Sequence, residues 1–311
     1  MMIDAHAHIM RELRGQTGRG PTRSLAYGKA QYGDEVIQLL PPLMEKTAFP
    51  PELLLANMDW AGVERAVLLQ GPFYGEANAY VAQAVRQWPD RFVAAGHIDP
   101  CAPDARDTFR RCIEEYGFPI LKFELSVGTG LVGLHPALRV DGDEMAWIWE
   151  EAERRGLVMT LDLGGVATAS YQTDAVRAIL ERHPQVKIVI CHLAQPPVGR
   201  ANDPTLDQLW QEQIRLARHP NVWFDLSALP GYAASVEDYP YATACGYIRR
   251  AVEMVGADRL MWGTDAPGLL GHATYPQLLS FVTRHCVFLT PEEMQKVLGD
   301  NAWRVYFQMQ V

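Results

Sequence analysis

Residues that commonly bind metal ions lie near the two ends of the sequence. His6 and His8 are two positions apart in an apolar N-terminal run, and Asp265 ends another apolar run. Side chains alternate between the two faces of a strand, so we expect Asp4, His6 and His8 to share one face and Ala5 to face the other way. Two imidazoles and a carboxylate suit a divalent cation. The spacing therefore predicts a metal site, with two polar residues on an exposed strand as the alternative.

A third histidine, His192, also ends an apolar run. If His192 faces the interior, alternation along the strand would turn Ile188 and Ile190 inward as well. Taken alone, a histidine in this position is more often a hydrogen-bonded core residue than a functional one. Asp265 shares the setting, and burying its carboxylate without a metal, a cation or several hydrogen bonds would cost too much free energy. All of these residues would have to be merely structural for this interpretation to fail, so together they predict a functional site.

Eight short apolar runs could position these residues. Their length and their β-branched side chains predict strands, and helical segments lie between them. Strands that alternate with helices pair in parallel, so the order predicts an α/β fold, either a closed (β/α)8 TIM barrel or an open doubly wound sheet. The predicted strands cover residues 2–9, 65–70, 92–98, 120–125, 157–163, 186–192, 222–226 and 260–265.

The position of the polar residues favours the barrel. His8, Asp162, His192 and Asp265 fall at or near the C-terminal ends of their predicted strands. A TIM barrel carries its active site at that end, where the strand ends and the following loops converge. We therefore predict that residues 1–311 form one TIM-barrel domain, a length that such barrels commonly reach.

Two helices are indicated by their capping residues and apolar spacing. Thr290, Pro291 and Glu293 form a capping-box pattern, and Gly299 is expected to end that helix. Thr173 begins a second segment, whose apolar residues are spaced as on one helical face. Those apolar residues are Ala175, Val176, Ile179 and Leu180.

A long connection follows the first predicted strand. Residues 10–52 are expected to be irregular, and a connection of this length commonly serves as a lid or binding loop. The alternative is a surface excursion that packs on the barrel or on a second subunit. Its arginines would suit an anionic group of a substrate. The arginines and tyrosines of this segment are Arg11, Arg14, Arg19, Arg23, Tyr27 and Tyr32.

The composition narrows the partners and the location. A net charge of −9 argues against nucleic acid and anionic membranes, and no apolar run approaches the ~18 residues of a membrane span. The five cysteines are scattered without a CxxC pair, and the early apolar run leaves no room for a signal peptide. We therefore predict a cytoplasmic protein that acts on a small molecule. The long connection and residues 307–311 are candidates for contacts in a homo-oligomer.

Four short motifs stand out in the sequence: His6-Ala7-His8, Cys191-His192, Gly263-Thr264-Asp265 and Leu298-Gly299-Asp300-Asn301-Ala302, with further similarity at residues 80–82 and 88–93. They resemble the amidohydrolase superfamily, in particular the branch that contains aminocarboxymuconate-semialdehyde decarboxylase. The similarity covers essentially the whole chain. The resemblance implies a (β/α)8 barrel that binds one divalent ion, often zinc, and acts as a hydrolase or a non-oxidative decarboxylase.

The resemblance also implies a role for single residues. His6 and His8 would be metal ligands from the first strand, and Asp265 would be the ligand from the eighth. His192 would activate a bound water or move a proton.

Asp162 departs from the family pattern, in which the fifth strand typically ends with a histidine ligand. A carboxylate can bind zinc, and two aspartates with two histidines also suit Mn²⁺. Alternatively Asp162 binds substrate or accepts a hydrogen bond, which leaves a weaker three-ligand site; some family members are thought to be lactonases that need no metal. We expect one divalent ion, with Zn²⁺ favoured over Mn²⁺.

Lys122 and Glu124 share a face of the fourth predicted strand. Facing inward, Lys122 could steady an anionic substrate, and Glu124 could reach the metal or pair with Lys122. A structural Lys–Glu pair inside the barrel is the alternative. A carboxylated lysine that bridges two metals is disfavoured, because the sequence offers too few extra ligands.

These features predict a metal-dependent hydrolase that acts on a small lactone, amide or ester carrying an acidic group. The ion would lower the pKa of its bound water towards ~7, and His192 would take the proton and return it to the leaving group, with Asp265 sharing this task. One alternative is a non-oxidative decarboxylase of a small aromatic or unsaturated carboxylic acid. The other is a non-catalytic binding barrel, since a fold alone does not establish an activity.

Overall fold

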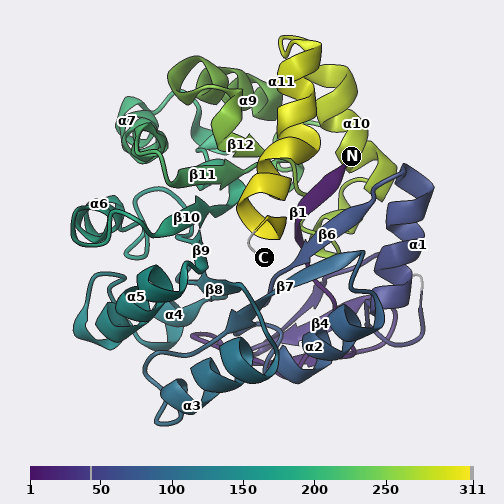
Figure 1. Cartoon of the computed structure of the whole chain (residues 1–311). Coiled ribbons are helices and arrows are strands. Elements are labelled where there is room, and N and C mark those ends of the chain that lie inside the picture. Colours follow the sequence, from purple (N-terminus) through teal and green to yellow (C-terminus); the bar gives the residue numbers. More distant parts are fainter. Residues whose placement is uncertain (43, 309–311) are drawn as a thin grey trace.

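Eight parallel strands form a barrel in the computed structural model, which describes residues 1–42 and 44–308 (Figure 1). Backbone hydrogen bonds join the first strand to the segment after the last, from Ala5 N to Trp262 O at 2.9 Å and from His8 N to Ala266 O at 2.7 Å. The predicted TIM barrel is thereby confirmed over the open sheet. In spatial order the strands are β1 Ile3–Ala7, β6 Arg65–Leu68, β7 Phe92–His97, β8 Ile120–Glu124, β9 Val158–Asp162, β10 Lys187–Ile190, β11 Val222–Asp225 and β12 Leu260–Met261.

Helices surround the sheet on its outer side (Figure 1). The two predicted from capping and spacing are confirmed: α6 buries the expected apolar face, and Thr290 and Glu293 form a capping box at the start of α11. Among the described residues no helix is long and apolar enough to cross a membrane. The helices are α1 Pro51–Ala61, α2 Asn78–Gln87, α3 Ala105–Arg110, α4 Leu131–Leu134, α5 Asp143–Arg155, α6 Thr173–Arg182, α7 Pro204–Ile214, α8 Leu229–Ala233, α9 Ala242–Val255, α10 Tyr275–His285 and α11 Pro291–Gln295.

Gly299 does not end the last helix, contrary to the prediction. The helical path continues from α11 through π-helical turns at Lys296–Asp300 and Trp303–Phe307. A Cβ atom on Gly299 would lie 2.1 Å from the carbonyl oxygen of Met1. Glycine is therefore needed there because the N-terminal backbone passes close by, and not because the helix must stop.

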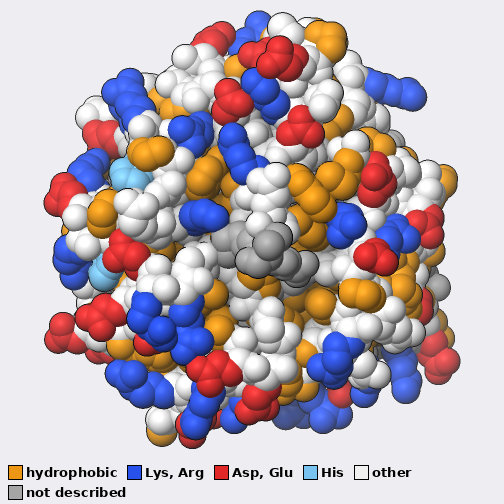
Figure 2. All heavy atoms as spheres, viewed as in Figure 1, with side chains coloured by type: hydrophobic (Ala, Val, Ile, Leu, Met, Phe, Trp, Pro, Cys, Tyr) orange, Lys and Arg blue, Asp and Glu red, His pale blue; other side chains and the backbone are white. Residues whose placement is uncertain are grey.

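The barrel interior is apolar at one end and polar at the other. An inner cluster of strand residues, including Ile3, Val67 and Val158, packs against the C-terminal residues Val305 and Tyr306. The C-terminal segment thus covers the end of the barrel at which the strands begin (Figure 1). On the face drawn in Figure 2, acidic and basic side chains are intermingled, so the net charge of −9 is not gathered there in one acidic patch.

The predicted inward placement of Ile188 and Ile190 is wrong. Both side chains belong to the large cluster that packs the sheet against the helices, whereas Val189 belongs to the inner cluster. His192 nevertheless reaches the barrel mouth, because the backbone leaves the strand after Ile190 and turns through positive φ angles of 59° at His192 and 49° at Leu193. The alternation of side chains ends where the strand ends.

Residues 16–38 of the long connection form regular structure, whereas the sequence predicted an irregular segment. They contain a four-stranded antiparallel sheet made of β2 Gln16–Thr17, β3 Gly20–Ser24, β4 Lys29–Tyr32 and β5 Glu35–Gln38. Two residues join β4 to β5, and Gly33 has the positive φ of 61° that a tight hairpin requires. We call β2–β5 the small sheet; it lacks the long apolar alternation by which strands are recognised in a sequence.

Candidate active site

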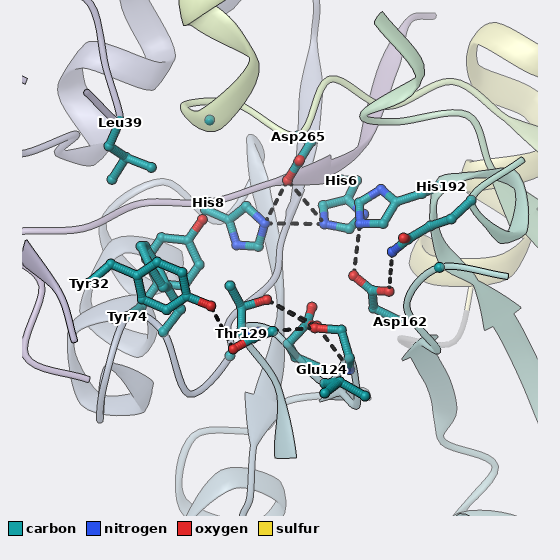
Figure 3. Close-up of a pocket in the computed structure, with 18 of the residues that line it drawn as sticks. His6, His8, Tyr32, Leu39, Tyr74, Glu124, Thr129, Asp162, His192 and Asp265 are labelled. Atoms are coloured by element: carbon teal, nitrogen blue, oxygen red, sulfur yellow. Dashed lines mark hydrogen bonds and ion pairs between the residues drawn. The ribbon is translucent and has the colours of Figure 1, made fainter. Parts of the chain in front are cut away.

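A cavity of about 490 Å³ opens at the C-terminal ends of the barrel strands (Figure 3). Its charged and polar lining includes His6, His8, Glu124, Asp162, His192 and Asp265. Its apolar wall includes Tyr32, Ile37, Leu39, Phe73, Tyr74 and Val127. The barrel thus brings together the strand-end residues singled out in the sequence, and the small sheet adds Tyr32 and Ile37.

His6, His8 and Asp265 converge on one point of this cavity (Figure 3). The Nε2 atoms of the two histidines are 3.2 Å apart. Asp265 Oδ1 lies 3.1 Å from His8 Nε2 and 3.6 Å from His6 Nε2. These three atoms face one another closely enough to share a single cation.

The outer nitrogens of both histidines are already engaged. His6 Nδ1 lies 3.0 Å from Asp225 Oδ2, and His8 Nδ1 lies 2.7 Å from the carbonyl oxygen of Leu69. Acceptors at both Nδ1 atoms select the tautomer with the proton on Nδ1, so both Nε2 atoms turn lone pairs towards each other. Burial lowers the pKa of His6 to about 4 against the opposing charge of Asp225, which keeps this ring neutral.

This donor set fits a divalent cation. Two facing lone pairs and a carboxylate oxygen repel one another unless a positive charge lies between them. Burial alone would raise the pKa of Asp265, but the adjoining His8 and the nearby His192 and His6 hold it below its usual value. Neutral imidazoles with their outer N–H groups bound to a carboxylate or a carbonyl are the usual arrangement of metal-binding histidines.

The first strand reaches this geometry through an irregular register. Its pairing with β6 shifts between Asp4 and Ala7. As a result Asp4 does not share a face with His6 and His8, as was expected, but accepts a hydrogen bond of 2.7 Å from Tyr275 on α10. Ala5 belongs to the inner cluster and does not face the helices.

His192 has a different environment although its ring stacks on that of His6, with centroids 4.7 Å apart. Its Nε2 lies 3.0 Å from Asp162 Oδ2, and its Nδ1 lies 2.8 Å from Ser227 Oγ. Burial favours the neutral ring, but the charge and hydrogen bond of Asp162 outweigh it and raise the pKa of His192 to about 9. In the metal-free site this environment therefore favours the doubly protonated ring of His192 at neutral pH.

Asp162 accepts hydrogen bonds from several groups. Besides His192, they come from Gly164 N and Gln195 Nε2, both at 2.8 Å from Oδ1. The charge of His192 holds the pKa of Asp162 well below its usual value against the effect of burial. This arrangement agrees with the alternative in which Asp162 accepts hydrogen bonds; its role as a metal ligand stays a prediction.

Glu124 and Lys122 both face inward, but only Glu124 lines the cavity. Burial, together with the charge of Asp162 on the neighbouring strand, raises the pKa of Glu124 to about 8. Lys122 lies beneath the cavity, where its Nζ is 3.2 Å from Cys191 Sγ and 3.9 Å from Glu124 Oε2. Its position does not support the predicted contact with substrate, since two inner side chains already surround the amine.

The structure adds Asp225 and Ser227, which the sequence reasoning did not single out. Asp225 binds His6 Nδ1 through one oxygen and accepts the backbone N–H of His192 at 2.9 Å through the other. Ser227 Oγ lies 3.1 Å from His6 Nδ1 and also contacts His192. The signal was available, because Asp225 ends the apolar strand β11 in the same way as Asp162 ends β9.

The arginines of residues 10–52 do not reach the cavity. Arg14 Nε pairs with Glu12 at 2.7 Å, and Arg19 lies over the ring of Tyr32. Among the described residues no arginine or lysine lines the cavity. The segment contributes apolar wall residues and Tyr32, whose hydroxyl donates a 2.7 Å hydrogen bond to the carbonyl oxygen of Gly128. The prediction of an arginine site for an anionic substrate is therefore wrong.

Comparison with known families matches residues 3–308 to the family described as Amidohydrolase. The chain belongs to this family. It is an amidohydrolase-superfamily hydrolase, which excludes the reading as a non-catalytic barrel. Its relatives include an L-fucono-1,5-lactonase of Burkholderia ambifaria, which is 29% identical over 98% of this chain and 94% of the relative.

Several solved structures share the amidohydrolase barrel. A Burkholderia multivorans amidohydrolase with bound zinc has a TM-score of 0.74 and 20% identity, covering 98% of this chain and 99% of that chain. A probable 2-pyrone-4,6-dicarboxylic acid hydrolase of Acinetobacter baumannii has a TM-score of 0.69 and 17% identity, covering 98% of each. At these identities the likeness shows the fold and not the substrate.

Proposed function

We propose that this protein is a metal-dependent lactonase whose substrates are small, neutral, hydroxylated lactones. The observation that carries the proposal is a cavity in which the His6, His8 and Asp265 donor set adjoins polar and apolar walls but no arginine or lysine among the described residues. The name of the Burkholderia ambifaria relative, L-fucono-1,5-lactonase, denotes a lactone of this class.

The charges of the cavity favour a neutral substrate over the acidic one that the sequence suggested. Its ionised carboxylates are Asp162 and Asp265, whereas the raised pKa of Glu124, about 8, keeps that group mostly protonated at neutral pH. His192 is already paired with Asp162. A substrate carboxylate away from the metal would therefore meet like charge in a partly buried site, which costs binding free energy. The decarboxylase alternative would place its substrate carboxylate on the metal, so it is disfavoured instead by the lactonase name of the Burkholderia ambifaria relative.

The two sides of the cavity suit a sugar-like ring. Leu39, Tyr32 and Tyr74 lie on one side, and Asp162 and His192 lie on the other (Figure 3). Tyr74 stacks on the ring of His8, with centroids 4.7 Å apart. Hydroxyl groups can hydrogen-bond the polar side, while an apolar ring face or substituent packs against the other side.

His6, His8 and Asp265 would hold the divalent ion, with Asp162, which stands where the family typically has a histidine, as the further predicted ligand. When bound, such an ion, for which Zn²⁺ is favoured over Mn²⁺, polarises a lactone carbonyl and lowers the pKa of a water molecule. Asp265 stays ionised at neutral pH and takes the proton of the attacking water. His192 donates a proton to the ring oxygen that leaves. In the sequence analysis His192 was expected to take the proton of the attacking water. A ring that already carries both protons cannot act as that base, so here His192 serves only as the acid.

A pH-stat assay of the purified protein tests this function. We expect acid release from five- and six-membered aldonolactones, and at least about tenfold lower kcat/KM for a lactone of matched ring size that carries a carboxylate. Removal of metal by a chelator should abolish the activity, and Zn²⁺ or Mn²⁺ should restore it. Release of CO2 from aromatic acids, or a preference for the anionic lactone, would contradict the proposal.

All five cysteines are free, which supports the predicted cytoplasmic location.

A further inference from the structure

A second group of metal-binding side chains lies outside the active-site cavity. Asp99 and Cys101 follow β7, and His135 follows α4. One ligand atom from each of the three lies within 4.8 Å of the other two. None of the three lines the active-site cavity. This group, which we call the Asp99 cluster, is therefore independent of the catalytic donor set.

Hydrogen bonds hold the Asp99 cluster together. Asp99 Oδ2 lies 2.9 Å from His135 Nε2, and Asp99 Oδ1 accepts the backbone N–H of Cys101 at 2.9 Å. The side chains of Asp99 and His135 are 30% and 33% exposed, and Cys101 is exposed. The ligands are thus close together while solvent can still reach them, as a metal entering from solution requires.

The chemistry of the three donors selects the ion. A thiolate, an imidazole and a carboxylate together suit Zn²⁺, whereas Mg²⁺ and Ca²⁺ prefer oxygen ligands alone. Three protein ligands leave one tetrahedral position for water. A further group, His6 with Cys191 and Asp225, is also compact, but it shares His6 with the active site and its sulfur already accepts a hydrogen bond from Lys122.

We propose that Asp99, Cys101 and His135 form a second binding site for Zn²⁺ or a similarly thiophilic divalent ion. Binding replaces the thiol proton, which is released to solvent, with a metal–sulfur bond. The ion joins the turn after β7 to the segment after α4, two loops at the same end of the barrel as the active site. This inference does not depend on the proposed lactonase activity.

Cys101 makes the test direct, because it is exposed and the other four cysteines are buried. The reaction of the native full-length protein with the thiol reagent DTNB is followed in EDTA, in micromolar Zn²⁺ and in millimolar Mg²⁺. We expect one fast thiol in EDTA, slowed at least tenfold by Zn²⁺ and unaffected by Mg²⁺. Cys101→Ser should remove the fast thiol and identify it.

His135→Ala and Asp99→Asn are the decisive variants. In both, Zn²⁺ should protect Cys101 at least fivefold less than in the wild type, and metal analysis should find one bound zinc fewer. His183→Ala is the matched control, since it breaks a comparable pair with Glu153 at 3.0 Å but leaves the Asp99 cluster intact; it should keep full protection. Equal reaction rates with and without Zn²⁺, protection by Mg²⁺, or undiminished protection in folded His135→Ala would overturn the proposal.

Discussion

Two histidines whose rings stack at 4.7 Å have pKa values shifted in opposite directions. His6 has a carboxylate on its outer nitrogen and a second imidazole at its inner one, and burial lowers its pKa to about 4. His192 has Asp162 on one nitrogen and Ser227 on the other, and its pKa is raised to about 9. Burial favours the neutral form of both rings, so the difference comes from their neighbours: Asp162 outweighs burial at His192, whereas Asp225 does not at His6.

The largest expected effect comes from removing a ligand on the metal-binding side. His8→Ala deletes one of the two facing Nε2 atoms, so we expect the bound metal to be lost and kcat/KM to fall about 10⁴-fold or more, because the ion contributes several kcal/mol to the transition state. Metal analysis and lactone hydrolysis measure the two effects together. Full activity without bound metal in this variant would show that His6 and His8 do not hold a catalytic ion.

His192→Ala is the matched change on the proton-carrying side. It should lower kcat by about 10²–10⁴-fold, the range for loss of an acid or base group, while the metal content stays near that of the wild type. His192→Gln, which keeps a hydrogen-bond donor, should recover part of the loss. If His192→Ala also loses the ion, the two histidines are not separate in function.

The stability of the metal-free protein should depend on pH through both rings, with opposite signs. The folded pKa of His192 lies above the usual histidine value of 6.5, so its contribution to stability is fully present below pH 6.5 and is lost as the pH rises through about 9. At about 1.4 kcal/mol per pKa unit this amounts to about 3 kcal/mol. For His6 the folded pKa is about 4, so its contribution grows as the pH rises from about 4 to 6.5.

Urea unfolding of the metal-free protein between pH 5 and 9.5 measures the difference. The decline in unfolding free energy between pH 6.5 and 9 should be smaller in His192→Gln than in the wild type by about 3 kcal/mol. Parallel pH profiles for the two proteins would show that His192 is not held in the charged form.

The smallest expected effect lies on the apolar wall, where neither ring is touched. Tyr32→Phe removes the hydrogen bond to Gly128 across the cavity, worth about 1 kcal/mol, so KM should rise about fivefold with little change in kcat. Tyr27→Phe is the control in the same segment, because Tyr27 is 57% exposed and does not line the cavity. An equal effect of both changes would place the cause outside the cavity.

Much of the fold could be predicted because its signals are local. The apolar runs that became β1 and β6–β12, the capping box at Thr290 and the apolar face of α6 each depend on neighbours a few residues away. The small sheet was missed because its strands are short and largely polar. Gly299 was misread because the constraint on it comes from Met1, at the other end of the chain.

Part of the candidate site could also be predicted, again because the signals for it are local in the sequence. Spacing and strand-end position drew attention to His6, His8, His192 and Asp265, which the structure brings to one cavity. Side-chain direction was predicted less well. The register shift in β1 and the positive φ angles after β10 each break the alternation from which the facing of Asp4 and Ile190 was inferred.

The sequence by itself determined which residue types stand at the strand ends and that eight strands alternate with helices, because composition and periodicity are properties of short segments. Only the tertiary structure decided the charge on each histidine. Asp225 lies 219 positions from His6, and Asp162 lies 30 positions from His192, so the partners meet only after the barrel closes. Desolvation and the nearest carboxylate set a pKa, and both depend on how the chain is packed.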